Sequence, residues 1–173
     1  MTDVHSKVIR SYNMSRIKGQ NTKPEIIVRK YLFSHGFRYR INVKALPGKP
    51  DIVLSKYKTV IFINGCFWHG HENCKFYVLP KTRTEWWKQK IGRNRERDVD
   101  VREKLRHIGW RTMVIWECQL KGRNKDKILD TIVSALNQAF IEQYKIVPKK
   151  YSIYKNSNVV AEEDLPYQIL KNG

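Results

Sequence analysis

Residues able to bind a metal ion or transfer a proton gather in one short stretch, VIFINGCFWHGHENC at 60–74. The soft and borderline ligands, including one later in the chain, are Cys66, His71, Cys74 and Cys118. Four such ligands make a closed tetrahedral zinc site. A free cysteine is more often a small hydrophobic residue of the core, but this set uses all three cysteines of the chain. The pattern therefore favours structural zinc, with His69 as a competing fourth ligand.

Asp51 offers a different kind of metal ligand. It follows Pro50 at the start of a short apolar segment, and the next apolar segment is Val60–Ile63. If these segments are neighbouring strands, Asp51 lies at a strand end beside the cysteine cluster. A carboxylate there can hold Mg²⁺, a hard cation that takes oxygen ligands. The alternative, an aspartate that only shapes a turn, is the commoner outcome for an isolated Pro-Asp pair.

His69 and Glu25 each have a chemical and a structural interpretation. Histidine titrates near neutral pH, which suits a general base or acid, whereas a surface position or a spare zinc ligand fits the spacing equally well. Glu25 ends the sequence Thr22-Lys-Pro-Glu25, which is typical of a capping box at a helix start. Capping accounts fully for Glu25, so its neighbourhood in the sequence predicts no catalytic role.

Aromatic side chains stand beside basic ones at two places. Phe67 and Trp68 belong to the Cys/His stretch, and Trp86 and Trp87 begin a basic helical segment. The basic neighbours of the second pair are Lys81, Arg83, Lys88 and Lys90. Flat side chains in a basic surface can stack on bases or wedge between them. Trp87 also falls on the apolar stripe of its helix, so a core position is an equal alternative for it.

The overall charge indicates a polyanionic partner. The chain has 34 Lys and Arg against 16 Asp and Glu, a formal charge of +18, which makes nucleic acid the first candidate. A membrane is disfavoured, because the sequence has no apolar run of transmembrane length, no lipidation motif and no basic amphipathic anchor. The start lacks the apolar core of a signal peptide, and an odd number of cysteines indicates reduced thiols. We expect a cytoplasmic protein.

The expected elements suit a single α/β domain. Apolar spacing, caps and turn residues predict helices at 23–35, 84–107 and 125–140 and strands at 37–43, 51–54, 59–63 and 111–116. Their order, α-β-β-β-α-β-α, implies a mixed or antiparallel sheet. We assign residues 1–147 to this domain and 148–173, which lack any period, to a C-terminal tail. A basic arm over about 1–21 is expected to touch phosphate, with an unstructured basic tail as the alternative.

Several longer motifs add a resemblance to a known family. They are NM at 13–14, SRIKGQNTKPE at 15–25, LPGKPD at 46–51, GCFWH at 65–69, TRT at 82–84, IG at 91–92 with Asn94, ERD at 96–98 and WEC at 116–118. Over Met1 to about Gly122 the chain resembles the very short patch repair (Vsr) endonucleases, bacterial enzymes that nick DNA at T:G mismatches. The resemblance implies a restriction-endonuclease-like core, α-β-β-β-α-β, with a mixed central sheet, flanking helices and a structural zinc site. The Glu-x-Lys motif usual in that superfamily is missing from Val60–Ile63, and the His-containing loop replaces it in this family.

The resemblance also implies roles for individual residues. Mg²⁺ would be bound by the Asp51 carboxylate and by the Ile63 backbone carbonyl. His69 would activate the attacking water, Asp98 would orient its ring, and Glu25 would bind water held by the metal. The implied zinc ligands are Cys66, His71, Cys74 and Cys118. The implied DNA contacts are the wedge aromatics Phe67, Trp68 and Trp87 and the base-contacting side chains Met14, Lys90 and Asn94.

The chain departs from the family at two positions: Asn64 stands where some members have a second active-site histidine, and the loop before Cys74 is one residue longer than in some members. Apart from these two departures, the resemblance leads us to expect a monomeric, Mg²⁺-dependent endonuclease with structural Zn²⁺, associated with the nucleoid of a bacterium. It would nick the thymine strand of double-stranded DNA beside a T:G mismatch left by deamination of 5-methylcytosine. Mismatch-repair proteins and a repair DNA polymerase are candidate partners.

Two other functions are compatible with the same residues. One is a restriction-type nuclease that cuts both strands of unmodified DNA with the same core. The other is a zinc-stabilised DNA-binding protein without activity, which would leave Asp51 and His69 without a task.

Overall fold

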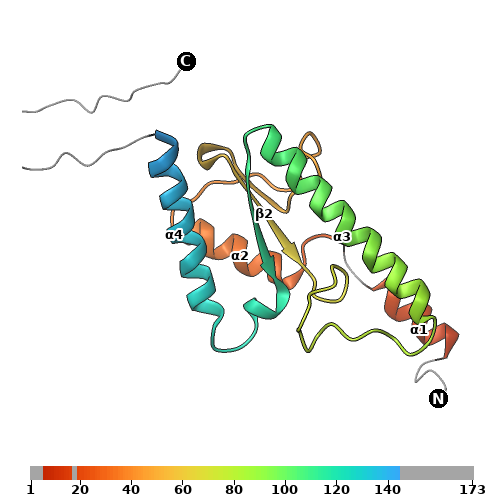
Figure 1. Ribbon diagram of the computed structural model, residues 1–173. Coiled ribbons are helices and arrows are strands. Elements are labelled where there is room, and N and C mark those ends of the chain that lie inside the picture. Colours follow the sequence, from red (N-terminus) through yellow and green to blue (C-terminus); the bar gives the residue numbers. More distant parts are fainter. Residues whose placement is uncertain (1–5, 17–18, 145–173) are drawn as a thin grey trace, which may run out of the picture.

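The computed structural model describes residues 6–16 and 19–144 as a mixed α/β arrangement (Figure 1). Its elements are α1 (Lys7–Ser15), α2 (Lys23–Ser34), β1 (Ile52–Leu54), the 3₁₀ turn η1 (Ser55–Tyr57), β2 (Thr59–Asn64), α3 (Thr84–His107), β3 (Arg111–Trp116), the 3₁₀ turn η2 (Glu117–Leu120) and α4 (Lys125–Tyr144). The predicted tail, 148–173, lies outside the described residues. Within the described ranges, no helix combines the length and the apolarity that crossing a membrane requires.

β2 is the central strand of the sheet. β1 runs antiparallel to it, with Ile52 opposite Ile61, and β3 runs parallel to it, with Asn64 opposite Trp116. The start of β1 therefore meets the ends of β2 and β3 at one end of the sheet. Residues that precede β1 or follow β2 and β3 come together there, although they lie far apart in the sequence.

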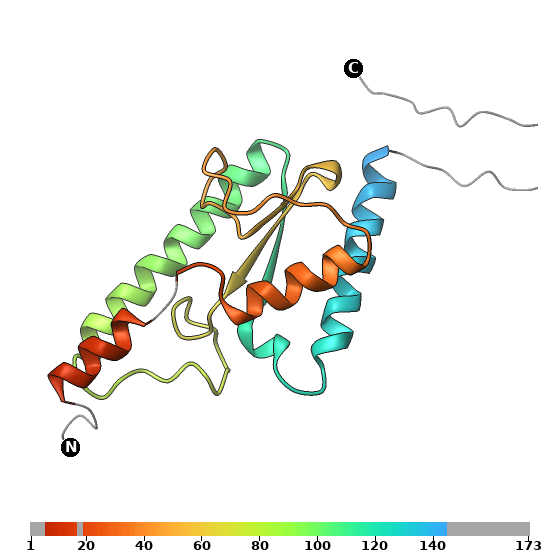
Figure 2. The same cartoon turned by 180° about the vertical axis from the view of Figure 1, so that it is seen from behind.

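The sheet is the middle of three layers, with α3 on one face and α2 and α4 on the other (Figures 1 and 2). Ile52 and Leu54 of β1 belong to the core cluster shared with α2 and α4, whereas Val53 between them packs with Leu105 of α3. Successive side chains of a strand point to opposite faces, which explains this alternation. The larger cluster is completed by buried residues that include Val28, Leu32, Ile61, Ile115, Leu129 and Leu136.

The predicted strand over 37–43 is wrong. Within it, only Arg40 pairs with the sheet, through an isolated bridge in which its N–H donates to the Val53 carbonyl at 2.9 Å and its carbonyl accepts from the Val53 N–H at 2.8 Å. Asn42 has a φ of 49°, in the left-handed region, which turns the chain away from the strand direction. The order is therefore α-α-β-β-α-β-α, and the sheet has three strands.

Helix α1 lies where the sequence predicts a basic arm. The Ser6 side chain caps it by accepting from the Ile9 N–H at 3.3 Å. Its exposed apolar side chains are Val8, Ile9, Tyr12 and Met14. In both views α1 lies beside the N-terminal half of α3 (Figures 1 and 2). Ser6 followed by apolar residues at helical spacing is the signal of this helix in the sequence.

Candidate active site and metal centre

A cleft of about 670 Å³ opens at the end of the sheet where β1 begins and β2 ends. Its lining includes Glu25, Asp51, Ile63, Asn64, His69 and Asp98. The turn before β1 approaches α3 closely because it contains Gly48, which has a φ of 72°. A Cβ at this position would lie 2.4 Å from Cγ1 of Val101, so glycine is required here for two reasons.

Asp51 lies immediately before β1, at the strand end where it was predicted, and its side chain faces the end of β2. Its Oδ2 accepts a hydrogen bond from the Ile63 N–H at 2.7 Å. The pKa of this carboxyl is raised to about 6, mainly by burial and also by the charge of Glu25, which together outweigh the lowering by the Ile63 hydrogen bond and by the charges of Arg29 and His69. Such a carboxylate is short of positive partners, which is a setting that fits a divalent cation.

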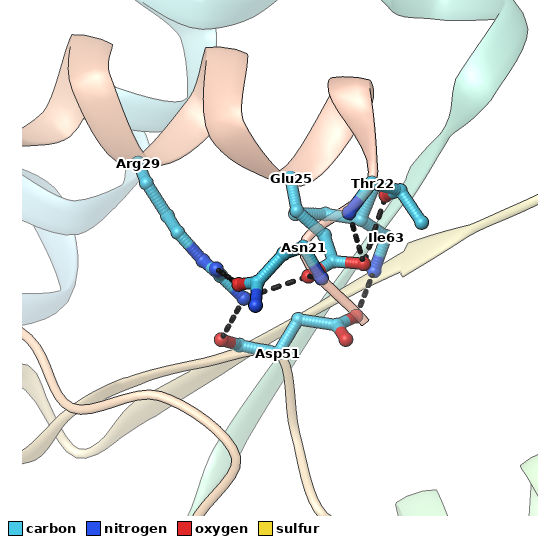
Figure 3. A network of polar contacts seen from close by, with 6 residues as sticks. All are labelled: Asn21, Thr22, Glu25, Arg29, Asp51 and Ile63. Carbon is cyan, nitrogen blue, oxygen red and sulfur yellow. Dashed lines mark hydrogen bonds and ion pairs between the residues drawn. The ribbon is translucent and has the colours of Figure 1, made fainter. Parts of the chain in front are cut away.

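Glu25 is buried, and every acceptor position of its carboxylate is engaged (Figure 3). Oε1 accepts from the N–H and the hydroxyl of Thr22, at 3.4 and 2.8 Å. Oε2 accepts from the Asn21 N–H at 3.0 Å and from Arg29 Nη2 at 2.7 Å. A carboxylate has about four lone-pair positions. The predicted capping box is therefore present, and the donor set fits a role in the outer shell of a metal better than direct ligation.

His69 and Asp98 form a pair across the cleft, although 29 positions separate them. Nδ1 of His69 lies 2.5 Å from Oδ2 of Asp98, and each side chain is about one quarter exposed, at 24% and 23%. When Nδ1–H donates to the carboxylate, Nε2 keeps its lone pair and can accept a proton. The geometry is that of a general base whose ring is held by an acid.

The four predicted zinc ligands come together beyond the end of β2. Their donor atoms all lie within 4.8 Å of one another, a spacing that suits one tetrahedral ion, whose ligands at about 2.0–2.3 Å are roughly 4 Å apart. The His71 ring lies flat on Trp116, with ring centres 4.1 Å apart, and its Nδ1 is 3.4 Å from Cys118 Sγ. Burial raises the pKa of the Cys66 thiol to about 12, so binding a metal here has to displace a proton. His69 is not in this cluster.

Three of the predicted DNA-contacting aromatics form one cluster. Ring centres of Phe67, Trp68 and Trp87 are 5.1 to 6.0 Å apart with the rings edge to face, and Trp86 packs on Trp87 at 4.7 Å. Lys90 Nζ lies 4.9 to 5.8 Å from the rings of the three tryptophans. Trp87 is only half-buried, so the alternative of a core position does not hold for it.

The remaining predicted residues have different surroundings. Asn94 Nδ2 donates to the Trp68 carbonyl at 2.9 Å, which ties α3 to the loop that carries the aromatics. Met14 is 43% exposed on α1. Asn64 is buried at the end of β2 and lines the cleft.

Arg29 belongs to this site and is missing from the residues predicted from the sequence. It is only 8% exposed and forms an ion pair with Glu25 one helical turn earlier. The i, i+4 spacing of opposite charges is the signal that could have indicated it.

The fold and the site fit one class of protein, an endonuclease acting on DNA: carboxylates and a histidine–aspartate pair line one cleft, and a basic, aromatic surface is formed by the loop after β2 and the start of α3. A family model described as DNA mismatch endonuclease Vsr matches residues 2–75. The type II nicking enzyme V.NmeAIP of Neisseria meningitidis serogroup A is 52% identical over 123 residues, which are 71% of this chain and 87% of the relative. The DNA mismatch endonuclease Vsr of Escherichia coli strain K12 is 45% identical over 125 residues, 72% of this chain and 80% of the relative. The chain belongs to the Vsr family of DNA mismatch endonucleases.

Proposed function

We propose that this endonuclease nicks the thymine strand beside a T:G mismatch, by Mg²⁺-dependent hydrolysis of one phosphodiester bond. The observation that carries the proposal is the meeting of Asp51 with the His69–Asp98 pair in one cleft. The names of the relatives, a mismatch endonuclease and nicking enzymes, support cleavage of one strand at a mispair.

In the proposed mechanism, Asp51 and the Ile63 carbonyl would hold a magnesium ion, and the chemistry that such an ion would supply is Lewis-acid polarisation of the scissile phosphate. Nε2 of His69 takes a proton from the attacking water, and Asp98 keeps the ring oriented and stabilises the imidazolium that forms. Glu25 would serve as an outer-shell acceptor for water bound to that ion, and its longest hydrogen bond, 3.4 Å from the Thr22 N–H, is the one it could most easily exchange.

Recognition of the mismatch is assigned to the aromatic cluster and to α1. A T:G pair is easier to unstack than a matched pair, so wedging by Phe67, Trp68 and Trp87 costs less at the mismatch. Met14 and Lys90 are proposed to contact bases. Asn94 donates one amide hydrogen to the Trp68 carbonyl and its Oδ1 accepts from Arg97 Nη2 at 3.5 Å, which leaves its second amide hydrogen for a base.

The finer architecture is also part of the proposal. We assign a restriction-endonuclease-like core, which the antiparallel β1–β2 and parallel β2–β3 pairings support, with Zn²⁺ as the structural ion. Residues 1–147 would be one domain and 148–173 an appended tail. The enzyme would work as a monomer on chromosomal DNA in the cytoplasm, with repair proteins as candidate partners.

The test uses two duplex pools that share randomised flanks and differ only in a central T:G or C:G pair, with each strand labelled separately. We expect Mg²⁺-dependent cutting of the thymine strand alone. Equal cleavage of the C:G pool would replace the mismatch function by a restriction-type one. Absence of any Mg²⁺-dependent cutting would leave only a DNA-binding protein.

His69→Gln is the matched variant for this assay, because glutamine keeps a polar side chain of similar length but cannot act as the base. It should bind the T:G duplex like the wild type and nick it roughly 10²–10⁴-fold more slowly.

A further inference from the structure

We propose that Arg29 is a positioning residue of the active site, whose guanidinium holds Glu25, the Asn21 turn and the main chain of Asp51 in the one arrangement that binds the catalytic metal. The inference rests on the proposed function, since it assigns Asp51 and Glu25 to the magnesium site. Arg29 would not touch substrate or metal. It would act through the Glu25 carboxylate and through the main chain of Asp51.

The contacts of Arg29 join three segments of the chain (Figure 3). Nη2 donates to Oε2 of Glu25 at 2.7 Å and, at 3.4 Å, to the Asp51 carbonyl. Nη1 donates to Oδ1 of Asn21 at 2.6 Å. One side chain of α2 is thus tied to the loop before that helix and to the residue that opens β1. The planar fork of a guanidinium can bridge such partners, whereas a lysine ammonium is a point charge.

Asn21 shows why this bridge matters for the site. Its φ of 55° lies in the left-handed region, which asparagine tolerates better than most residues. Its side chain is held by Arg29 and its N–H by Glu25. The turn that places Thr22 beside the Glu25 carboxylate is therefore fixed by two contacts of Asn21, one to Arg29 and one to Glu25. Loss of either partner would loosen the other contacts.

Stability alone does not explain an arginine here. The side chain is nine-tenths buried, and its Nε finds no acceptor among the described residues. A buried charge with an unpaired donor is costly, and replacing buried ion pairs by well-packed apolar residues is often neutral or stabilising. The position of Arg29 is better explained by its bonds to the Glu25 carboxylate and to the main chain of Asp51, from where its positive charge also opposes the effect of the Glu25 charge on Asp51.

The test compares Arg29→Lys and Arg29→Met with the wild type. Binding of Mn²⁺ to the zinc-loaded protein is followed by the EPR signal of the free ion, and nicking is followed against Mg²⁺ concentration. Residues that orient metal ligands contribute roughly 10- to 100-fold to affinity or activity. We expect losses in that range for both variants in both measurements, including Arg29→Lys, which keeps the charge but not the fork.

A double-mutant cycle shows whether Arg29 acts through Glu25. Arg29→Met combined with Glu25→Gln should lose no more than the worse single variant. Leu136→Ala removes a fully buried apolar side chain of α4 that does not line the cleft. It is the control for destabilisation, and it should leave the Mn²⁺ affinity unchanged.

Wild-type Mn²⁺ affinity in Arg29→Lys, tighter Mn²⁺ binding in Arg29→Met, or an equal loss in Leu136→Ala would each overturn the inference. If Arg29→Met does not fold, Arg29→Lys decides it. Failure of the wild type to nick any T:G duplex would instead refute the proposed function, while the Mn²⁺ measurement would still test Arg29.

Discussion

Asp51 shows the conflict between stability and chemistry at the scale of one residue. It is placed at the end of the sheet beside a second carboxylate, and its pKa is raised to about 6 mainly because the site is buried. A bound cation would offset both the burial of the negative charge and its repulsion by Glu25. In the absence of a divalent ion, the ionised form of Asp51 should therefore weaken the fold that holds it.

Asp51→Asn should stabilise the protein at alkaline pH in magnesium-free buffer. The folded-state pKa of about 6 lies above the ordinary value of 3.8, so the stabilising contribution of the protonated group is complete below about pH 4 and is lost as the pH rises through 6. Asparagine keeps the acceptor for the Ile63 N–H without the charge. With a discount for partial exposure, we expect a gain of about 1–2 kcal/mol at pH 8.

Urea unfolding of the zinc-loaded wild type and variant measures this difference. The gain should shrink toward zero at about pH 4, and the variant should have lost Mg²⁺-dependent nicking. A gain that is equally large at both pH values would show that the charge of Asp51 is not its cause.

At the scale of elements, the loop between β2 and α3 has no regular secondary structure of its own in the range 65–83. Two kinds of contact hold this loop in place: those within the Cys/His cluster, and close packing against α3. Gly70 has a φ of 61°, and a Cβ there would lie 2.8 Å from Cγ2 of Ile91 and 3.0 Å from Cδ of Arg95. Because the loop carries Phe67 and Trp68, the contacts that hold the loop in place also position the aromatic cluster.

Removal of zinc, or Cys118→Ser, should disorganise this loop and leave the sheet folded. The two core clusters of the structure are built from the sheet and its helices, and do not include the cysteines. We expect the near-UV circular dichroism of the tryptophans to collapse while the far-UV signal changes little. T:G binding should weaken by roughly 10-fold or more, since stacking contributes about 1–3 kcal/mol per base.

Re-addition of zinc supplies the control, because it should restore the wild type and not the variant. Cooperative loss of both signals together on chelation would contradict this separation, and so would an unchanged near-UV spectrum.

At the scale of the whole molecule, the formal charge of +18 controls affinity more than specificity. Lys and Arg contacts to phosphate release counter-ions without reading the bases. Basic residues are also concentrated in the segment 81–111, which includes α3 and has eleven Lys or Arg against five Asp or Glu. Affinity for any duplex should therefore depend steeply on salt.

Binding of the non-cleaving Asp51→Asn variant should fall roughly 10³–10⁵-fold between about 50 and 200 mM salt if six to ten phosphates are contacted. Fluorescence anisotropy with T:G and C:G duplexes measures it. The two slopes should be nearly equal, because the preference for T:G comes from the aromatic cluster and base contacts. A nearly flat dependence would mean that few phosphates are bound.

Much of the fold follows from local patterns in the sequence. The Thr22–Glu25 capping box predicts where α2 starts, and Gly109 predicts that α3 ends just before it, as it does at His107. The apolar runs predict β2 and β3. Local sequence patterns fail to predict secondary structure where tertiary contacts determine it. The segment 37–43 has strand composition but pairs only through Arg40, because strand pairing needs a partner in register, which composition does not specify.

By itself, the sequence determined which side chains are available for chemistry: soft metal ligands, a carboxylate beside them, histidines, and aromatic residues among basic ones. These depend on residue type and short spacing, which the chain carries locally. Spacing left the division among them open, and the family resemblance implied one; the tertiary structure places His69 beside Asp98 and outside the cysteine cluster, and it alone revealed Arg29 joining Glu25 to Asp51. Those contacts join segments up to 29 residues apart, and they exist because an antiparallel and a parallel strand pair bring three chain segments to the same end of one sheet.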